Sequence, residues 1–284
     1  MTRPLFALLP LLLGACSPLG AFNGVVAKDK GGVLVARNQA FGADPRQRLD
    51  IYAPRGTAPG AKLPVIVWFY GGSWNSGAKE EYAFAGRALA AQGFVVAIPD
   101  YRLVPQVRYP AFLEDGAAAV RLVRASAARF GGDADRIVLA GHSAGAYNAA
   151  MLSLDPVWLG EDRRAVRGFV GLAGPYDFLP LDVASTQAAF GAVSNLQATQ
   201  PINAASAGDP PALLAAGTKD TLVRPAQSSR LAARLAGAGV SVETKLYPGI
   251  GHIGIMTALS RPLRGKAPVL ADVANFSRRV TQQP

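Results

Sequence analysis

The chain has 284 residues, of which 50% are hydrophobic and 17% are charged. A chain of this length can bury one large core, and its composition is that of a globular protein, so extensive disorder is excluded. The net charge is +10, but the 29 Lys and Arg are scattered, and adjacent basic pairs occur only at Arg163-Arg164 and Arg278-Arg279. Because no basic block interleaves with aromatic residues, nucleic-acid binding is not expected.

The amino-terminal segment has the pattern of an export signal. Arg3 is followed by a mostly apolar run over residues 5–13, which is too short to span a bilayer. The next residues complete Leu13-Gly14-Ala15-Cys16, which resembles the lipobox of bacterial lipoproteins, where the cysteine becomes the lipidated first residue after cleavage. Because Cys16 is the only cysteine, no internal disulfide is possible, and lipidation is favoured over ordinary secretion. We therefore expect a signal peptide over residues 1–16 and an exported protein, anchored by lipid in the bacterial envelope and facing the periplasm.

Residues 17–32 have the composition of a flexible spacer, and residues 33–284 are expected to form one domain. Apolar, β-branched and alternating runs predict strands at residues 33–36, 48–53, 65–70, 94–98, 136–140, 167–173, 212–216 and 241–247. Ala-rich stretches and helical spacing predict helices at residues 82–92, 112–130, 144–151, 225–235 and 269–280. Residues 178–209 are expected to be irregular. Strands alternating with helices predict an α/β fold, with a mostly parallel central sheet and helices on both faces.

One junction between strand and helix carries a recognisable motif. Gly141-His142-Ser143-Ala144-Gly145 lies between the strand predicted at 136–140 and the helix predicted at 144–151. A Gly-x-Ser-x-Gly in this context is a nucleophile elbow, in which the serine stands on a strained turn with its hydroxyl exposed. The helix that follows directs N–H groups and the positive end of its dipole toward an oxyanion formed there. Ser143 is therefore the candidate nucleophile.

A serine hydroxyl needs an adjacent base at neutral pH, and the chain contains only two histidines. His142 is next to the nucleophile, and adjacent residues of an elbow point away from each other. His252 remains as the base, on a Gly-rich loop directly after the last predicted strand.

The third member of a triad is a carboxylate, and in α/β-hydrolases it lies between the serine and the histidine in the sequence. Asp220 follows the strand predicted at 212–216, at the edge where parallel sheets place their sites. Asp177 also follows a predicted strand and is the alternative. We favour Asp220.

An oxyanion hole requires at least two N–H groups directed at one point. One is expected from Ala144, directly after the nucleophile. A second is expected from the loop after the strand predicted at 65–70, where Gly71 and Gly72 allow the backbone to approach a ligand closely.

The chain resembles the α/β-hydrolase esterases related to hormone-sensitive lipase, kynurenine formamidase and the bacterial feruloyl-esterase-like group. The resemblance covers roughly residues 47–280 and includes the elbow. Its other motifs appear, in the family's order, as Tyr70-Gly71-Gly72-Ser73-Trp74, Asp100-Tyr101-Arg102-Leu103-Val104-Pro105, Gly217-Thr218-Lys219-Asp220-Thr221-Leu222-Val223 and Tyr247-Pro248-Gly249-Ile250-Gly251-His252. The resemblance implies that Gly72 and Ser73 supply oxyanion N–H groups. Tyr70 departs from the family's histidine, which supports the oxyanion loop, and Gln106 is a second departure.

These observations predict a serine hydrolase that cleaves carboxylic esters through an acyl-enzyme. A small-molecule ester is the expected substrate, and without a metal cluster or nucleotide fingerprint no cofactor is implied. The segment 178–209 is rich in Ala, Gln, Ser and Asn, which favours short acyl chains over the broad apolar lid of a lipase. An amidase or formamidase and a catalytically silent binding lipoprotein are the alternatives. The oligomeric state and the natural substrate are left open.

Overall fold

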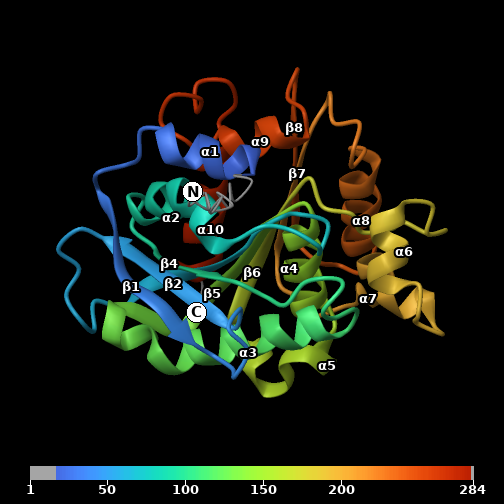
Figure 1. Cartoon of the computed structure of the whole chain (residues 1–284), viewed down its shortest axis with the longest axis horizontal. Helices are drawn as coiled ribbons and strands as arrows, with labels where there is room; N and C mark the ends of the chain where they lie inside the picture. Colours follow the sequence, from blue (N-terminus) through green and yellow to red (C-terminus); the bar gives the residue numbers. More distant parts are fainter. Residues whose placement is uncertain (1–16, 283–284) are drawn as a thin grey trace, which may run out of the picture.

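The computed structural model describes residues 17–282, in which eight strands form one sheet in the order β1-β2-β4-β3-β5-β6-β7-β8 (Figure 1). The strands are β1 (Gly32–Ala40), β2 (Arg48–Pro54), β3 (Leu63–Phe69), β4 (Val95–Pro99), β5 (Gly132–His142), β6 (Val166–Leu172), β7 (Ala212–Gly217) and β8 (Val242–Tyr247). β2 is antiparallel to both β1 and β4, and every other neighbouring pair is parallel. The mostly parallel sheet expected from the sequence is confirmed.

Helices cover both faces of this sheet. The longer ones are α2 (Ala83–Ala90), α3 (Ala111–Ser126), α4 (Ala144–Leu154), α8 (Ala226–Gly237) and α10 (Val269–Gln282). α2 and α10 contact each other on one face, whereas α3 and α4 pack together on the other (Figure 1). The shorter ones are α5 (Pro156–Leu159), α6 (Ala184–Phe190), α7 (Pro201–Ala204), α9 (His252–Thr257) and the 3₁₀ turns η1 (Lys79–Tyr82), η2 (Ala127–Phe130), η3 (Gly160–Ala165) and η4 (Leu196–Thr199). None of the helices among residues 17–282 is long and apolar enough to cross a membrane.

The central strands are buried on both sides, as their continuous apolar runs require. Residues 65–69 of β3 are each 0% exposed, and β3 pairs in parallel with β5, with Phe69 opposite Gly141. β7 and β8 pair in the same way, with Gly217 opposite Tyr247. Because parallel strands end at the same edge, the segments that follow β3, β5, β7 and β8 lie together there. This edge carries the candidate site.

The spacer expected over residues 17–32 contains a helix instead, α1 (Pro18–Val25), which packs against η1. Ser17 caps this helix by accepting the N–H of Gly20 at 2.9 Å, and its hydroxyl donates to Glu81 at 2.5 Å. Phe22 meets Phe84 edge-on, with 5.3 Å between ring centroids. These long-range contacts order a segment whose composition alone suggested flexibility. Cys16 and the expected signal peptide lie outside the described residues.

The segment 178–209, expected to be irregular, also contains short helices, α6, η4 and α7. Phe190, at the end of α6, is fully buried. It lies in an aromatic cluster with Trp74, Phe112, Tyr147 and Phe178, with ring centroids 4.9 to 5.7 Å from its own. The segment is therefore packed onto the domain through its few large apolar residues.

Candidate active site

Ser143 lies between the last residue of β5 and the first residue of α4. Its backbone has φ 55° and ψ −125°, in the region that L-residues rarely adopt. The flanking glycines make this turn possible, since a Cβ on Gly145 would lie 2.1 Å from the carbonyl oxygen of Phe69, and one on Gly141 would lie 2.3 Å from that of Gly145. The local geometry is thus that of a nucleophile elbow.

His252 reaches Ser143 from the segment after β8. Its Nε2 lies 2.9 Å from Ser143 Oγ, across 109 residues of sequence. It is not in a loop, as the glycines before it suggested, but is the first residue of the short helix α9. The preceding loop, with Gly249 at φ 73°, turns the chain from β8 toward Ser143.

Asp220 completes a hydrogen-bonded chain of three side chains. Its Oδ2 lies 2.8 Å from Nδ1 of His252, and its Oδ1 accepts the N–H groups of Leu222 and Val223 at 3.0 and 2.9 Å. The carboxylate is buried, and these bonds fix its orientation. The alternative, Asp177, is not brought to His252; it pairs with Arg230 at 2.9 Å.

The loop after β3 lies against Ser143. A Cβ on Gly71 would be 2.9 Å from Ser143 Cβ, so only glycine fits without a shift. The next residues, Gly72, Ser73 and Trp74, have φ values of 129°, 50° and 58°. Trp74 Nε1 donates to Asn148 Oδ1 on α4 at 3.1 Å, which ties this loop to the helix that begins with Ala144. The amides expected to form the oxyanion hole thus belong to two segments that meet beside Ser143.

Tyr70 and Gln106, the two departures from the family pattern, both make polar contacts. The Tyr70 hydroxyl donates to Asp100 at 2.8 Å and accepts from Arg46 at 2.7 Å. Gln106 donates to Asp44 on the protein surface. Tyr70 therefore anchors the start of the loop from within the core.

His142 has a structural contact that sequence reasoning missed. Its ring is buried, with Nε2 2.9 Å from the backbone oxygen of His252, so the neutral ring donates a hydrogen bond there. Burial, and secondarily the nearby His252, lowers the pKa of His142 to about 3. Its Nδ1 is buried without a hydrogen-bond partner among the described residues. The sequence carries no signal for this contact, because the partner is a backbone group far along the chain.

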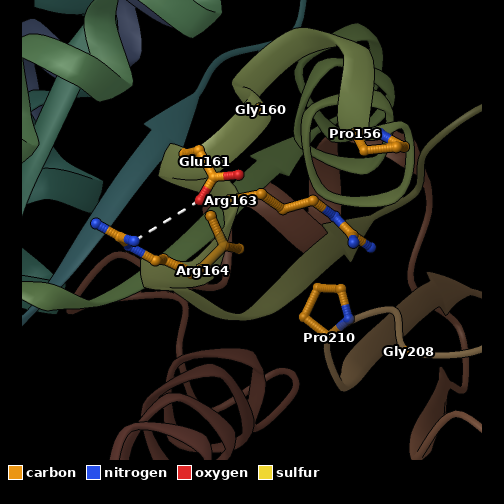
Figure 2. A pocket seen from close by; sticks show the side chains of 8 residues that line it. Pro156, Gly160, Glu161, Arg163, Arg164, Gly208 and Pro210 are labelled. Carbon is orange, nitrogen blue, oxygen red and sulfur yellow. Dashed lines mark ion pairs between the residues drawn. The ribbon is translucent and has the colours of Figure 1, made fainter.

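Two hollows in the described surface lie elsewhere. One, of about 430 Å³, is lined by Pro156, Glu161, Arg163, Arg164 and Pro210, near the amino end of β6 (Figure 2). Arg163 there is already engaged with Ser153 and Asp209, and Arg164 with Glu161. The other, of about 390 Å³, lies over Lys79 and Asp100. Neither hollow is lined by Ser143. Among residues 17–282, no group of three or more His, Cys, Asp or Glu is arranged to hold a metal ion.

The sequence of this chain is similar to those of known esterases. A family model described as BD-FAE matches residues 49–235. A probable isoprenylcysteine alpha-carbonyl methylesterase of Oryza sativa subsp. japonica is 31% identical over 256 residues, covering 81% of this chain and 59% of the rice protein. Esterase LipC of Mycobacterium tuberculosis is 36% identical over 151 residues, covering 50% of this chain and 37% of that protein. The chain therefore spans less than two thirds of the length of these curated relatives.

Solved structures show the same fold. Esterase B from Lactobacillus rhamnosis superposes with a TM-score of 0.80 at 20% identity, covering 93% of this chain and 91% of that one. A truncated carbohydrate esterase from gut microbiota gives a TM-score of 0.77 at 20% identity, covering 91% of this chain and 100% of that one. With the sheet order, the elbow and the family match in place, the chain belongs to the BD-FAE family of α/β-hydrolase esterases.

Proposed function

We propose that the protein hydrolyses carboxylic esters through an acyl-enzyme formed on Ser143. The observation that carries this proposal is the continuous chain of hydrogen bonds from Ser143 through His252 to Asp220, with links of 2.9 and 2.8 Å. Such an arrangement can activate a hydroxyl that is otherwise a weak nucleophile.

The proposed reaction uses each residue in turn. Ser143 Oγ attacks the acyl carbon while its proton passes to Nε2 of His252. Asp220 accepts the Nδ1–H bond, which holds the imidazole in the correct tautomer and stabilises the imidazolium. The amides of Gly72, Ser73 and Ala144 stabilise the oxyanion. His252 then protonates the leaving alcohol, and a water molecule, deprotonated by His252, releases the acid and regenerates Ser143.

A panel of esters, assayed with the wild type and with Ser143→Ala, tests this proposal. Ser153→Ala is a matched control, because Ser153 lies on the same helix and donates only to the carbonyl of Ala149. We expect the first variant to lose nearly all turnover and the second to keep it. Matched amides and N-formyl amides in the same panel distinguish an esterase from an amidase. A folded wild type without turnover, unlabelled by a fluorophosphonate, would indicate a binding protein instead.

We further propose a preference for short acyl chains. Trp74, in the loop after β3, packs edge-on against Tyr147 of α4 and against Phe190 of the segment 178–209, and all three rings are buried. Among the large apolar residues of that segment, only Val183 is exposed, at 51%. Since each buried methylene contributes only about 0.8 kcal/mol, a long acyl chain needs a broad apolar surface. We expect kcat/KM for p-nitrophenyl esters to peak at short chains, whereas a peak at palmitate or a rate jump above the micelle concentration would identify a lipase.

A further inference from the structure

The peptide group between Tyr70 and Gly71 is held at both ends by tyrosine hydroxyls. The hydroxyl of Tyr101 donates to the carbonyl oxygen of Tyr70 at 2.9 Å, and the N–H of Gly71 donates to the hydroxyl of Tyr82 at 3.1 Å. Both hydrogen bonds are buried. Because the carbonyl and the N–H belong to one planar unit, two bonds at opposite edges resist its rotation about the chain axis.

The three tyrosines form a stack with Tyr70 in the middle. Its ring centroid lies 4.8 Å from that of Tyr101 and 5.5 Å from that of Tyr82, at interplanar angles of 19° and 28°. Burial raises the pKa of all three phenols above the ordinary value, so their hydroxyls stay protonated. The stack thus offers fixed neutral groups to the peptide that it surrounds.

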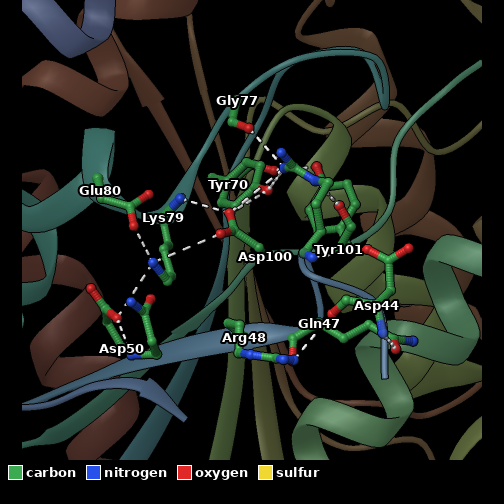
Figure 3. A network of polar contacts seen from close by, with 12 residues as sticks. Asp44, Gln47, Arg48, Asp50, Tyr70, Gly77, Lys79, Glu80, Asp100 and Tyr101 are labelled. Carbon is green, nitrogen blue, oxygen red and sulfur yellow. Dashed lines mark hydrogen bonds and ion pairs between the residues drawn. The ribbon is translucent and has the colours of Figure 1, made fainter. Parts of the chain in front are cut away.

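Further bonds hold the outer parts of this assembly. Asp100 accepts from the Tyr70 hydroxyl and from the backbone N–H of Lys79, both at 2.8 Å (Figure 3). Arg46 donates to the carbonyl oxygens of Tyr101 and Gly77, at 2.8 and 2.9 Å. The loop that starts at Tyr70 is therefore held by hydrogen bonds with tyrosines at its beginning and with Arg46 at its end, Gly77.

Between Gly71 and Gly77, the loop contains residues with strained backbones. Ser73 and Trp74 have positive φ values without being glycine, and such conformations persist only where the surroundings impose them. Gly71 lies against Ser143, so a rotated Tyr70–Gly71 peptide would shift the next amides relative to the nucleophile.

We propose that Tyr82 and Tyr101 are positioning residues of the ester hydrolysis, which fix the Tyr70–Gly71 peptide and thereby aim the amides of Gly72 and Ser73 at the oxyanion. This inference rests on the function proposed above. Neither tyrosine touches the substrate. Their effect is exerted through the loop, in the transition state, where hydrogen bonds to the oxyanion matter most.

The test removes single hydroxyls and keeps the stacked rings, in Tyr82→Phe and Tyr101→Phe. Tyr52→Phe is the matched control, since Tyr52 is equally buried but lies on β2, and its hydroxyl makes no hydrogen bond to the loop in the described structure. For each variant, kcat and KM are measured with p-nitrophenyl butyrate, together with the melting temperature. The inhibition constant of a trifluoromethyl ketone is also measured, because its serine adduct places an oxyanion in the hole.

We expect each of the two loop variants to lose about tenfold in kcat with KM changed by less than about twofold. The inhibition constant should rise in proportion to the loss in kcat/KM, whereas Tyr52→Phe should change neither quantity. A kcat within about twofold of wild type in the folded variants, or an unchanged inhibition constant beside a reduced kcat, would overturn the proposal. If one variant fails to fold, the other decides. Equal turnover by wild type and Ser143→Ala would instead overturn the proposed function, and this inference with it.

Discussion

At the scale of single residues, the candidate site depends on one histidine and one carboxylate, His252 and Asp220. Only one histidine besides the neighbour of Ser143 exists, and the structure brings that histidine to the serine. The sequence favours Asp220 but leaves Asp177 as an alternative, because both follow strands at the same edge of the sheet. The structure separates them: Asp220 contacts His252, and Asp177 contacts Arg230.

The first prediction concerns this pair of carboxylates. Asp220→Asn should lower kcat on the order of 10⁴-fold, because the amide no longer holds the imidazole in the required tautomer. Asp177→Asn serves as the matched control and should leave kcat nearly unchanged. Steady-state kinetics on one ester, with circular dichroism to verify folding, provide the comparison. A larger loss in Asp177→Asn would show that the acid has been assigned wrongly.

His142 leads to a second prediction at this scale. Its pKa falls from 6.5 to about 3 on burial, so the unfolded chain binds a proton between these values that the folded chain does not. The free energy of unfolding is therefore not lowered by His142 above pH 6.5. It falls by up to about 1.4 kcal/mol per pH unit as the pH drops from 6.5 toward 3. His142→Gln should show a shallower acid dependence of the unfolding free energy, measured in urea from pH 7 to pH 4. Parallel curves for the two proteins would contradict the assigned pKa.

At the scale of elements, the sequence predicts the sheet and its long helices better than the short segments around the site. Runs such as residues 65–69 reveal a buried strand because both faces of a central strand must be apolar. The sequence does not predict α9, since this helix has only six residues and is stabilised by its contacts with β7. The sequence also does not predict the hydrogen bonds of Tyr82 and Tyr101 to the Tyr70–Gly71 peptide, because the hydroxyl of Tyr82 comes from a different element.

The third prediction tests how closely the loop after β3 lies to the elbow. In Gly71→Ala, the new Cβ would stand 2.9 Å from Ser143 Cβ and 3.1 Å from His142 Nδ1, so the loop or the nucleophile must move. A shift near 1 Å at the reacting groups should cost about 100-fold in kcat/KM. The control is Gly237→Ala at the end of α8, where nothing lies within 4 Å of the new Cβ. If Gly71→Ala kept normal turnover, the two segments would not be in contact during the reaction.

At the scale of the whole molecule, the amino-terminal region shows where composition misleads. The composition of residues 17–20 is typical of a linker, yet α1 packs against the domain. Phe22 contacts Phe84, and the side chain of Asn23 accepts the N–H of Phe84 at 3.1 Å. Contacts between residues some 60 positions apart cannot be deduced from local pattern. α1 is therefore part of the folded domain.

The fourth prediction concerns the contribution of α1 to stability. A chain beginning at residue 17 should keep the melting temperature of the full protein, whereas one beginning at residue 26 loses α1 and should melt several degrees lower. Equal melting temperatures of the two shortened chains would contradict this contribution.

We also propose that Cys16 carries a lipid anchor in the bacterial envelope. In a bacterial host, the wild type should partition with membranes and Cys16→Ser should not. Recovery of soluble wild type with a mature amino terminus other than Cys16 would rule out the anchor.

The proposed ester hydrolysis depends on Ser143 as the nucleophile. The most direct measurement is mass spectrometry of peptides from the folded protein after reaction with a fluorophosphonate. We expect one adduct, on the peptide that contains Ser143, and loss of ester turnover in proportion to labelling. His252→Ala should slow the labelling strongly, because the hydroxyl then lacks its base. An adduct on a different residue, or full ester turnover by the fully labelled protein, would show that Ser143 is not the nucleophile.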